Sequence, residues 1–162
     1  MPSVHSWSES NGSGEVVTDG IANINFGSND SYNLAPASYL ITAGANSFKK
    51  YIRCKFTSTY TEISNMKFWK SAGALGTGEV ITAAANATFA TPSAGASGDS
   101  AIPTTEGTAL ALNSAEGAAT IVYGGSGVSG YTGYLRLQLQ TTESTPAGAV
   151  AQKTLTFQFD EV

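Results

Sequence analysis

The side chains that enzymes most often use as nucleophiles or general bases are scarce in this sequence. The chain has one histidine, His5, and one cysteine, Cys54. A catalytic Ser-His-Asp or Cys-His arrangement needs an imidazole that a packed scaffold holds within hydrogen-bond distance of the nucleophile. His5 lies in a segment rich in serine and glycine, and Cys54 falls on the apolar side of an alternating segment. We therefore expect an exposed or interface position for His5, a buried position for Cys54, and no enzymatic activity.

The acidic residues indicate neither an acid/base pair nor a metal site. Twelve aspartates and glutamates are spread singly, mostly in or beside predicted turns, and only Asp160 and Glu161 are adjacent. The sequence has no calcium-loop run of alternating aspartates and no zinc-type spacing, and its glycine-rich run 124–127 lacks the lysine of a phosphate-binding loop. We expect no cofactor and no metal. Two alternatives stay open: a carboxylate pair that folding brings together, and a calcium ion held by loop carbonyls.

The basic residues are concentrated in one part of the sequence, because six of the eight lysines and arginines fall within residues 49–70. The predicted basic surface consists of the basic and aromatic side chains of this region: Lys49, Lys50, Tyr51, Arg53, Lys55, Lys67, Trp69 and Lys70. Such a surface suits an acidic protein partner by charge complementarity, or single-stranded nucleic acid by stacking. A solvated polar sheet face has the same composition. The net charge of −4 disfavours a general nucleic-acid binder, so we expect no nucleic-acid partner.

The elements that must position these side chains are β-strands, because apolar residues recur at every second position. The clearest alternation covers residues 51–57, 135–140 and 154–160. Successive side chains of a strand point to opposite faces, so each segment has one apolar and one polar face. Weaker alternation predicts further strands at 4–9, 15–18, 21–26, 39–43, 62–70, 79–83, 108–112 and 118–123. No segment has the pattern of a convincing amphipathic helix.

Glycine, asparagine and proline separate these segments, which predicts an all-β fold. We expect an antiparallel β-sandwich of the jelly-roll type, with long loops and little or no helix. Residues 47–58 and 62–70 should pair as a hairpin, and residues 91–108 should form a long surface loop. Residues 1–14 are expected to be a flexible N-terminal arm, followed by a single domain at 15–162.

Composition excludes several classes of protein. A lone cysteine cannot staple a small secreted domain, and no apolar run approaches the roughly 18 residues that cross a bilayer. No signal-peptide pattern is visible, so we expect no membrane partner. Charged residues make up only 12% of the chain, against roughly 25% in an average domain. A surface poor in charge is typical of an interface with another protein.

Three segments resemble patterns found in virion proteins of tailed phages: YIRCKFT at 51–57, ISNMKFWKS at 63–71 and the closing LTFQFDEV at 155–162. The resemblance is to small, acidic capsid decoration (cement) proteins rich in glycine, alanine and threonine. It implies a β-sandwich in the virion, bound to the outer face of the major capsid protein lattice, often as a homotrimer. It brings no catalytic motif and no residue-level motif for the contact.

The function predicted from the sequence is therefore that of a virion structural protein, which bridges neighbouring capsid subunits and stabilises the shell. A repeating lattice lets many small contacts add up through avidity. The alternative is a carbohydrate-binding β-sandwich module or adhesin, in which exposed aromatic rings stack on sugars. The candidate platforms for that alternative are Trp7, Trp69, Tyr131 and Tyr134.

Overall fold

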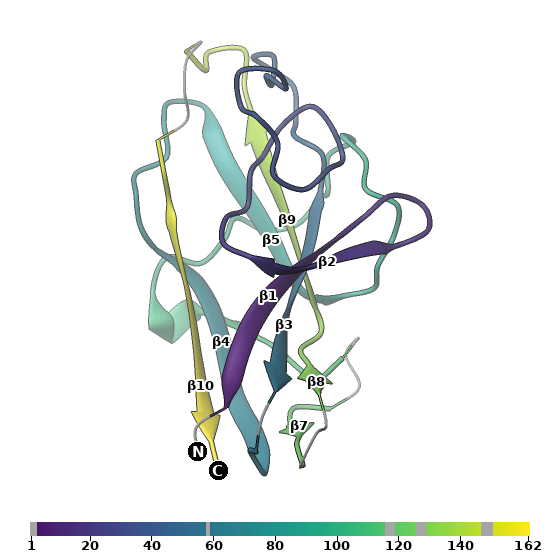
Figure 1. Cartoon of the computed structure of the whole chain (residues 1–162). Helices are drawn as coiled ribbons and strands as arrows, with labels where there is room; N and C mark the ends of the chain where they lie inside the picture. Colours follow the sequence, from purple (N-terminus) through teal and green to yellow (C-terminus); the bar gives the residue numbers. More distant parts are fainter. Residues whose placement is uncertain (1–2, 58, 116–118, 126–128, 147–150) are drawn as a thin grey trace.

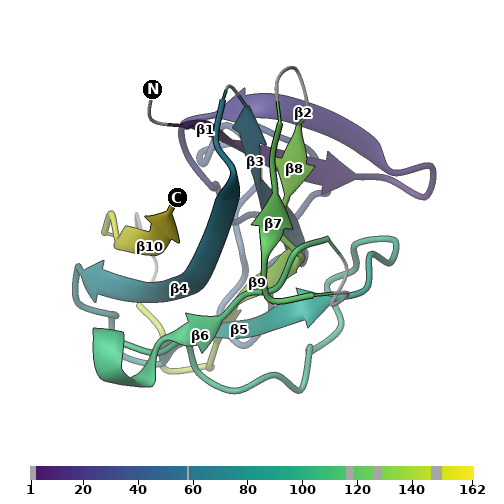
Figure 2. The same ribbon diagram turned by 90° about the horizontal axis from the view of Figure 1, so that it is seen from below.

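The computed structural model describes residues 3–57, 59–115, 119–125, 129–146 and 151–162. In these residues the backbone forms two antiparallel sheets that pack against each other, without an α-helix, so the protein is an all-β sandwich, as its sequence predicts (Figure 1). Within the same residues, no helix has the length and hydropathy needed to span a bilayer. Seen end-on, β10 and β4 lie across the core from β1 and β3 (Figure 2).

Sheet A has the strand order β2-β1-β3-β9-β5, with β8 paired to β3. Its strands are β1 (Val4–Asn11), β2 (Val16–Ile21), β3 (Lys50–Thr57), β5 (Glu79–Ala87), β8 (Gly130–Tyr131) and β9 (Tyr134–Thr141). Sheet B has the order β10-β4-β6, with β7 paired to β4. Its strands are β4 (Glu62–Ala72), β6 (Leu110–Ala111), β7 (Val122–Tyr123) and β10 (Thr154–Glu161), and a short 3₁₀ helix at Glu106–Thr108 precedes β6.

The core lies between the sheets and is made by the apolar faces that the alternation predicts. The buried side chains of β3, β9 and β4 that meet there are Ile52, Cys54, Phe56, Leu135, Leu137, Leu139, Ile63, Met66 and Phe68. Each isoleucine, leucine, methionine or phenylalanine among them contributes about 1.5–3 kcal/mol when it is fully buried. In β4 the inward positions shift by one residue at a bulge, where Asn65 has a φ of 49°. Asparagine tolerates this left-handed backbone better than most residues.

The predicted hairpin between residues 47–58 and 62–70 is wrong, because β3 and β4 belong to different sheets. Both edges of β3 are already occupied, by β1 on one side and by β8 and β9 on the other. The chain crosses from sheet A to sheet B at this point instead of reversing within one sheet. The apolar faces of the two strands therefore meet across the core.

The N-terminal segment is not a free arm in the described residues. β1 pairs with β3 over residues 4–10 and with β2 over residues 7–11, so it lies inside sheet A. Residues 12–15 form the turn between β1 and β2. The sequence predicts a strand at residues 4–9 within this arm, but its place between β2 and β3 depends on distant segments that local alternation does not reveal.

Several weaker strand predictions also need correction. Of the strand predicted at 21–26, residues 22–26 form a loop, and so do residues 39–43. A hydrogen bond from the Ser28 N–H, just after the first loop, to the Tyr39 carbonyl at 3.1 Å connects the two segments. The predictions at 108–112 and 118–123 shorten to β6 and β7, and residue 118 lies outside the described residues. The strands predicted near 4–9, 15–18, 62–70 and 79–83 are confirmed.

The outer face of sheet A is polar in sequence but is partly covered by the loop that follows β5. Gln138 of β9 is fully buried there. Its amide donates to the carbonyls of Ser47 at 2.8 Å and Gly95 at 3.0 Å, and its Oε1 accepts from the Ser97 N–H at 2.9 Å. The loop predicted at 91–108 thus supplies backbone partners to a sheet face that would otherwise be solvated.

Candidate docking surfaces

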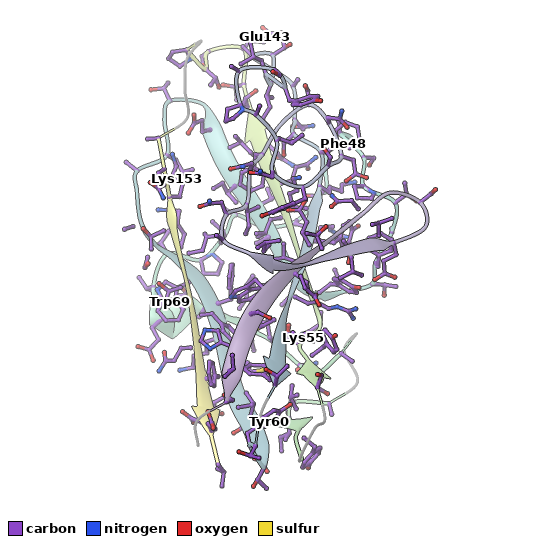
Figure 3. The ribbon with its side chains drawn as sticks, viewed as in Figure 1. Phe48, Lys55, Tyr60, Trp69, Glu143 and Lys153 are labelled. Atoms are coloured by element: carbon purple, nitrogen blue, oxygen red, sulfur yellow. The ribbon has the colours of Figure 1, made fainter. Side chains whose placement is uncertain are left out.

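The predicted basic surface does not exist as one surface. Lys55 lies on sheet A and Trp69 on sheet B, and the two are well separated (Figure 3). Three members of the predicted set, Lys50, Tyr51 and Lys70, are buried and cannot contact a partner. The physical reason is that the strands carrying these residues do not pair, and that neighbouring loops and strands cover part of their polar faces.

Lys50 forms a buried ion pair with Glu9 of β1. Its Nζ lies 2.8 Å from Glu9 Oε1, and the side chains are 0% and 1% exposed. The same Nζ donates to the Ser31 carbonyl at 2.8 Å, and Glu9 Oε1 also accepts from Asn11 Nδ2 at 2.9 Å. This lysine therefore holds β1, β3 and the loop at residue 31 together, which is a structural role.

The basic residues of sheet B are divided between its two faces. Lys70 is buried, and its Nζ donates to the Gly73 carbonyl at 2.8 Å. Lys67 and Trp69 are half-buried on the opposite, outer face, where Lys67 Nζ lies 3.3 Å from Glu106 Oε1 in an exposed ion pair. Lys49, which precedes β3 of sheet A, donates to Ser93 Oγ at 3.2 Å. The polar outer face of sheet B thus keeps only part of the predicted charge.

On the outer face of sheet A, four side chains form what we call the Arg53 cluster: Arg53, Lys55, Tyr131 and Tyr134. The guanidinium carbon of Arg53 lies 4.5 Å from the ring centre of Tyr131 and 4.7 Å from that of Tyr134. Lys55 Nζ lies 5.6 Å from the Tyr131 ring centre. Cations are attracted to the faces of aromatic rings, so these contacts restrict where the basic groups sit. The sequence alone did not predict that Tyr131 and Tyr134 join Arg53 and Lys55, because they come from distant strands.

Two acidic side chains border the Arg53 cluster. Asp19 of β2 lies 3.0 Å from Lys55 Nζ, and this hydrogen bond is the main reason that the pKa of Lys55 is raised. Tyr134 is buried and donates its hydroxyl hydrogen to Glu15. Burial, and then the bond to the Glu15 carboxylate, raise the pKa of Tyr134. Tyr134 therefore stays a neutral phenol at neutral pH, in a cluster that also holds two cations and is bordered by two carboxylates.

A second feature is the inter-sheet groove, a cavity of about 1720 Å³ on the side of the sandwich where sheet B ends at β10. Its apolar walls come from β1, β10 and the loops at 22–26, 36–43 and 74–77. They include Trp7, Ile24, Phe26, Ile41, Leu75, Leu155 and Phe157. These side chains are only partly buried, although they pack against the core. Interiors of proteins are normally close-packed, so a space of this size is room for another molecule or segment.

The groove closes at the end where the two termini lie and opens toward the other end. At the closed end, beside the termini, Ser3 donates from its N–H and its hydroxyl to the Glu161 carboxylate at 2.7 and 2.6 Å. The His5 ring packs edge-on against Phe159, with ring centres 5.6 Å apart. From this end β10 and β1 diverge (Figure 1). At the start of β10, Lys153 Nζ lies 3.7 Å from Glu79 Oε2, and both side chains are less than a tenth exposed.

The strand β10 is the edge of sheet B, and in the described residues it pairs only with β4. Its residues alternate between the groove, where Leu155 and Phe157 lie, and the outer face, where Thr156 and Gln158 lie. An edge strand presents backbone N–H and C=O groups that a further strand can use. The groove thus combines an apolar lining with a strand edge.

His5 and Cys54 are far from forming a catalytic arrangement in the described residues. His5 is exposed and its ring is engaged with Phe159. Cys54 is buried, as the sequence predicts, and desolvation raises the pKa of its thiol to about 12. No group of three or more His, Cys, Asp or Glu side chains that could hold a metal ion occurs among these residues.

Few of the rings proposed as sugar platforms present a free face. Tyr134 is buried, and Arg53 and Lys55 lie over the ring of Tyr131. Trp7 packs edge-on against Phe157, with ring centres 5.1 Å apart. Of the four rings proposed as sugar platforms, that leaves Trp69, which is half-buried on the outer face of sheet B.

Comparisons with known proteins give no relative: no protein-family model, no curated protein and no solved structure matches this chain.

Proposed function

We propose that this protein is a virion structural protein of the capsid decoration (cement) type, which binds the outer surface of the major capsid protein lattice and bridges neighbouring subunits. The observation that carries the proposal is the inter-sheet groove beside the open edge of β10. The resemblance of three sequence segments to decoration proteins supports it independently.

The groove suits an extended segment of a neighbouring protein. Such a segment would add to β10 through backbone hydrogen bonds and place alternate apolar side chains in the groove, next to Leu155 and Phe157. This mode of binding needs few specific side chains, because the backbone supplies most of the polar contacts. It also covers apolar surface that the isolated chain leaves partly exposed.

Bridging requires two separate contact surfaces on one rigid body. The Arg53 cluster lies on the outer face of sheet A, and the groove opens beside β10 of sheet B. The core between the sheets, with side chains such as Leu135 and Ile63 fully buried, keeps the two surfaces at a constant separation. On a repeating lattice, two weak contacts made at once give strong attachment.

The experiment is co-sedimentation of the purified protein with capsid particles that lack it. We expect saturable binding to assembled particles and no binding to unassembled capsid subunits, since bridging needs neighbours. A pair of variants on adjacent residues tests the groove: Leu155→Lys places a charge in it, whereas Thr156→Lys places the same charge on the outer face. Leu155→Lys should weaken particle binding at least tenfold, and Thr156→Lys should leave it unchanged.

Circular dichroism and unfolding curves of both variants show whether either has lost its fold. Absence of particle binding by the unmodified protein would overturn the proposed function. Equal binding by the two folded variants would overturn the role of the groove. The homotrimer belongs to the same proposal, and light scattering after size-exclusion chromatography tests it, with a monomeric mass at working concentration as the opposing result.

A further inference from the structure

The chain has two arginines, Arg53 and Arg136, and both lie on the outer face of sheet A with very different partners. Arg136 binds Asp99 through two parallel hydrogen bonds, from Nε to Oδ2 at 2.8 Å and from Nη2 to Oδ1 at 2.5 Å. This two-point contact is the geometry in which guanidinium and carboxylate groups fit best. Asp99 comes from the loop that covers this part of the sheet.

Arg53 has no such carboxylate. Among the described residues, its guanidinium takes part in no ion pair within 4.0 Å, and its Nε is buried without a hydrogen-bond acceptor. A buried donor without an acceptor is unfavourable, and native proteins generally satisfy such groups. The covering loop reaches Arg136 but does not supply an acidic side chain to Arg53.

The position of the Arg53 guanidinium is nevertheless well defined. It lies over the rings of Tyr131 and Tyr134, at 4.5 and 4.7 Å from their centres. Tyr134 is itself held by its hydrogen bond to Glu15 and by edge-on packing against Tyr51, with ring centres 6.3 Å apart. A cation that is already ordered loses little conformational entropy when a ligand binds.

We infer that the Arg53 cluster is a carboxylate-binding site, which takes an aspartate or glutamate side chain of a partner protein. The acidic side chain would give the Arg53 guanidinium the negative counter-charge that Asp99 gives the Arg136 guanidinium. That the partner is a capsid subunit rests on the proposed function, whereas the carboxylate chemistry rests on the two arginines alone.

The charges around the site favour a single carboxylate over a polyanion. Asp19 and Glu15 border the cluster, and the whole chain has a net charge of −4. A nucleic acid or another polyanion would bring several negative charges next to these carboxylates and be repelled. One acidic side chain needs only the one unpaired guanidinium.

The test uses the side-chain Nε–H signals of the arginines in the NMR spectrum of the ¹⁵N-labelled full chain. Two arginines give two signals, and the variants Arg53→Lys and Arg136→Lys assign them independently. The probe is the peptide acetyl-Gly-Glu-Gly-Glu-Gly-amide, with the glutamine version of the same peptide as the control. Inorganic phosphate forms a third arm.

The glutamate peptide should shift the Arg53 signal saturably, in the millimolar range expected for one short contact, and leave the Arg136 signal in place. The glutamine peptide should shift neither signal. No shift with the glutamate peptide, or equal shifts with both peptides, would overturn the inference. A stronger response to phosphate than to the glutamate peptide would also overturn it, in favour of a phosphate site.

A particle-binding arm separates this inference from the proposed function. Arg53→Gln should weaken binding to capsid particles at least tenfold, while Lys67→Gln, which removes one charge from the outer face of sheet B, should not. Failure of the unmodified protein to bind particles, together with the shift of the Arg53 signal, rejects the proposed function and leaves the carboxylate site standing.

Discussion

Replacement of Lys50 by methionine should destabilise the protein by about 3–5 kcal/mol, the range for removal of one partner of a buried ion pair. Methionine fills much of the same space but leaves the Glu9 carboxylate, whose side chain is 1% exposed, without its cation. Glu9 would retain the hydrogen bond from Asn11 Nδ2 at 2.9 Å. The Ser31 carbonyl would lose the bond that it accepts from Lys50 at 2.8 Å.

The structure also predicts the loss of stability when both partners of the ion pair, Glu9 and Lys50, are replaced. In the double variant Glu9→Met and Lys50→Met no buried charge remains, and the principal residual loss is the bond to the Ser31 carbonyl, which is worth about 1–3 kcal/mol. The double variant should therefore be more stable than Lys50→Met alone. The coupling free energy between the two sites should be about 2 kcal/mol or more, near the upper part of the range for residues in contact.

The assay is equilibrium unfolding in urea, followed by the fluorescence of the two tryptophans, Trp7 and Trp69; Trp7 lies on the same strand as Glu9. Lys67→Met serves as the control, because its ion pair with Glu106 is exposed and should contribute at most about 1 kcal/mol. Two results would refute the reasoning: a Lys50→Met variant within about 1 kcal/mol of the unmodified protein, or free-energy changes at the two sites that simply add.

Three further predictions follow from individual residues. Burial raises the pKa of the Cys54 thiol from 9.0 to about 12, so the thiol should react with an alkylating reagent only on unfolding. The contribution of the neutral thiol to stability should be full below pH 9.0 and should fall as the pH rises toward about 12. Unfolding curves at alkaline pH will show this loss. The Arg136 guanidinium lowers the pKa of Asp99 from 3.8, so this carboxylate should stabilise the fold above pH 3.8 and lose that effect as the pH falls through the lowered pKa. Asp99→Asn should remove this part of the dependence of stability on acid pH. An unchanged dependence in unfolding curves at acid pH would contradict the assignment. Gly73 has a φ of 83°, and a Cβ there would lie 2.5 Å from the Gln152 carbonyl oxygen. Gly12 has a similar φ of 71°, but the space around it is open. In urea unfolding, Gly73→Ala should therefore lower the free energy of unfolding more than Gly12→Ala.

The strand content and the core of this protein could be predicted from the sequence because they depend on local alternation. The segments that became β3, β9 and β10 were predicted from period two alone, and so was the burial of Cys54. The hydrophobic effect fixes which face of such a strand turns inward, whatever strand lies next to it.

The candidate docking residues could be predicted only in part. Arg53 and Lys55 lie on one polar face of β3, as their spacing indicates, but Lys50 forms a fully buried ion pair with Glu9 and is not part of a surface. No signal in the sequence connects Lys50 with Glu9, 41 positions earlier. Likewise, no signal in the sequence connects Arg136 with its partner Asp99, which lies in a segment predicted to be a surface loop.

The sequence by itself determined the period of the elements, the positions of most turns and the apolar face of each strong strand. Only the tertiary structure decided that β3 and β4 belong to different sheets, that β1 lies within sheet A, and that the groove opens beside β10. The physical reason is that the two kinds of interaction act over different separations along the chain. Alternation acts between residues two apart, whereas strand order and charge pairing depend on which distant segments satisfy one another's backbone groups and buried charges.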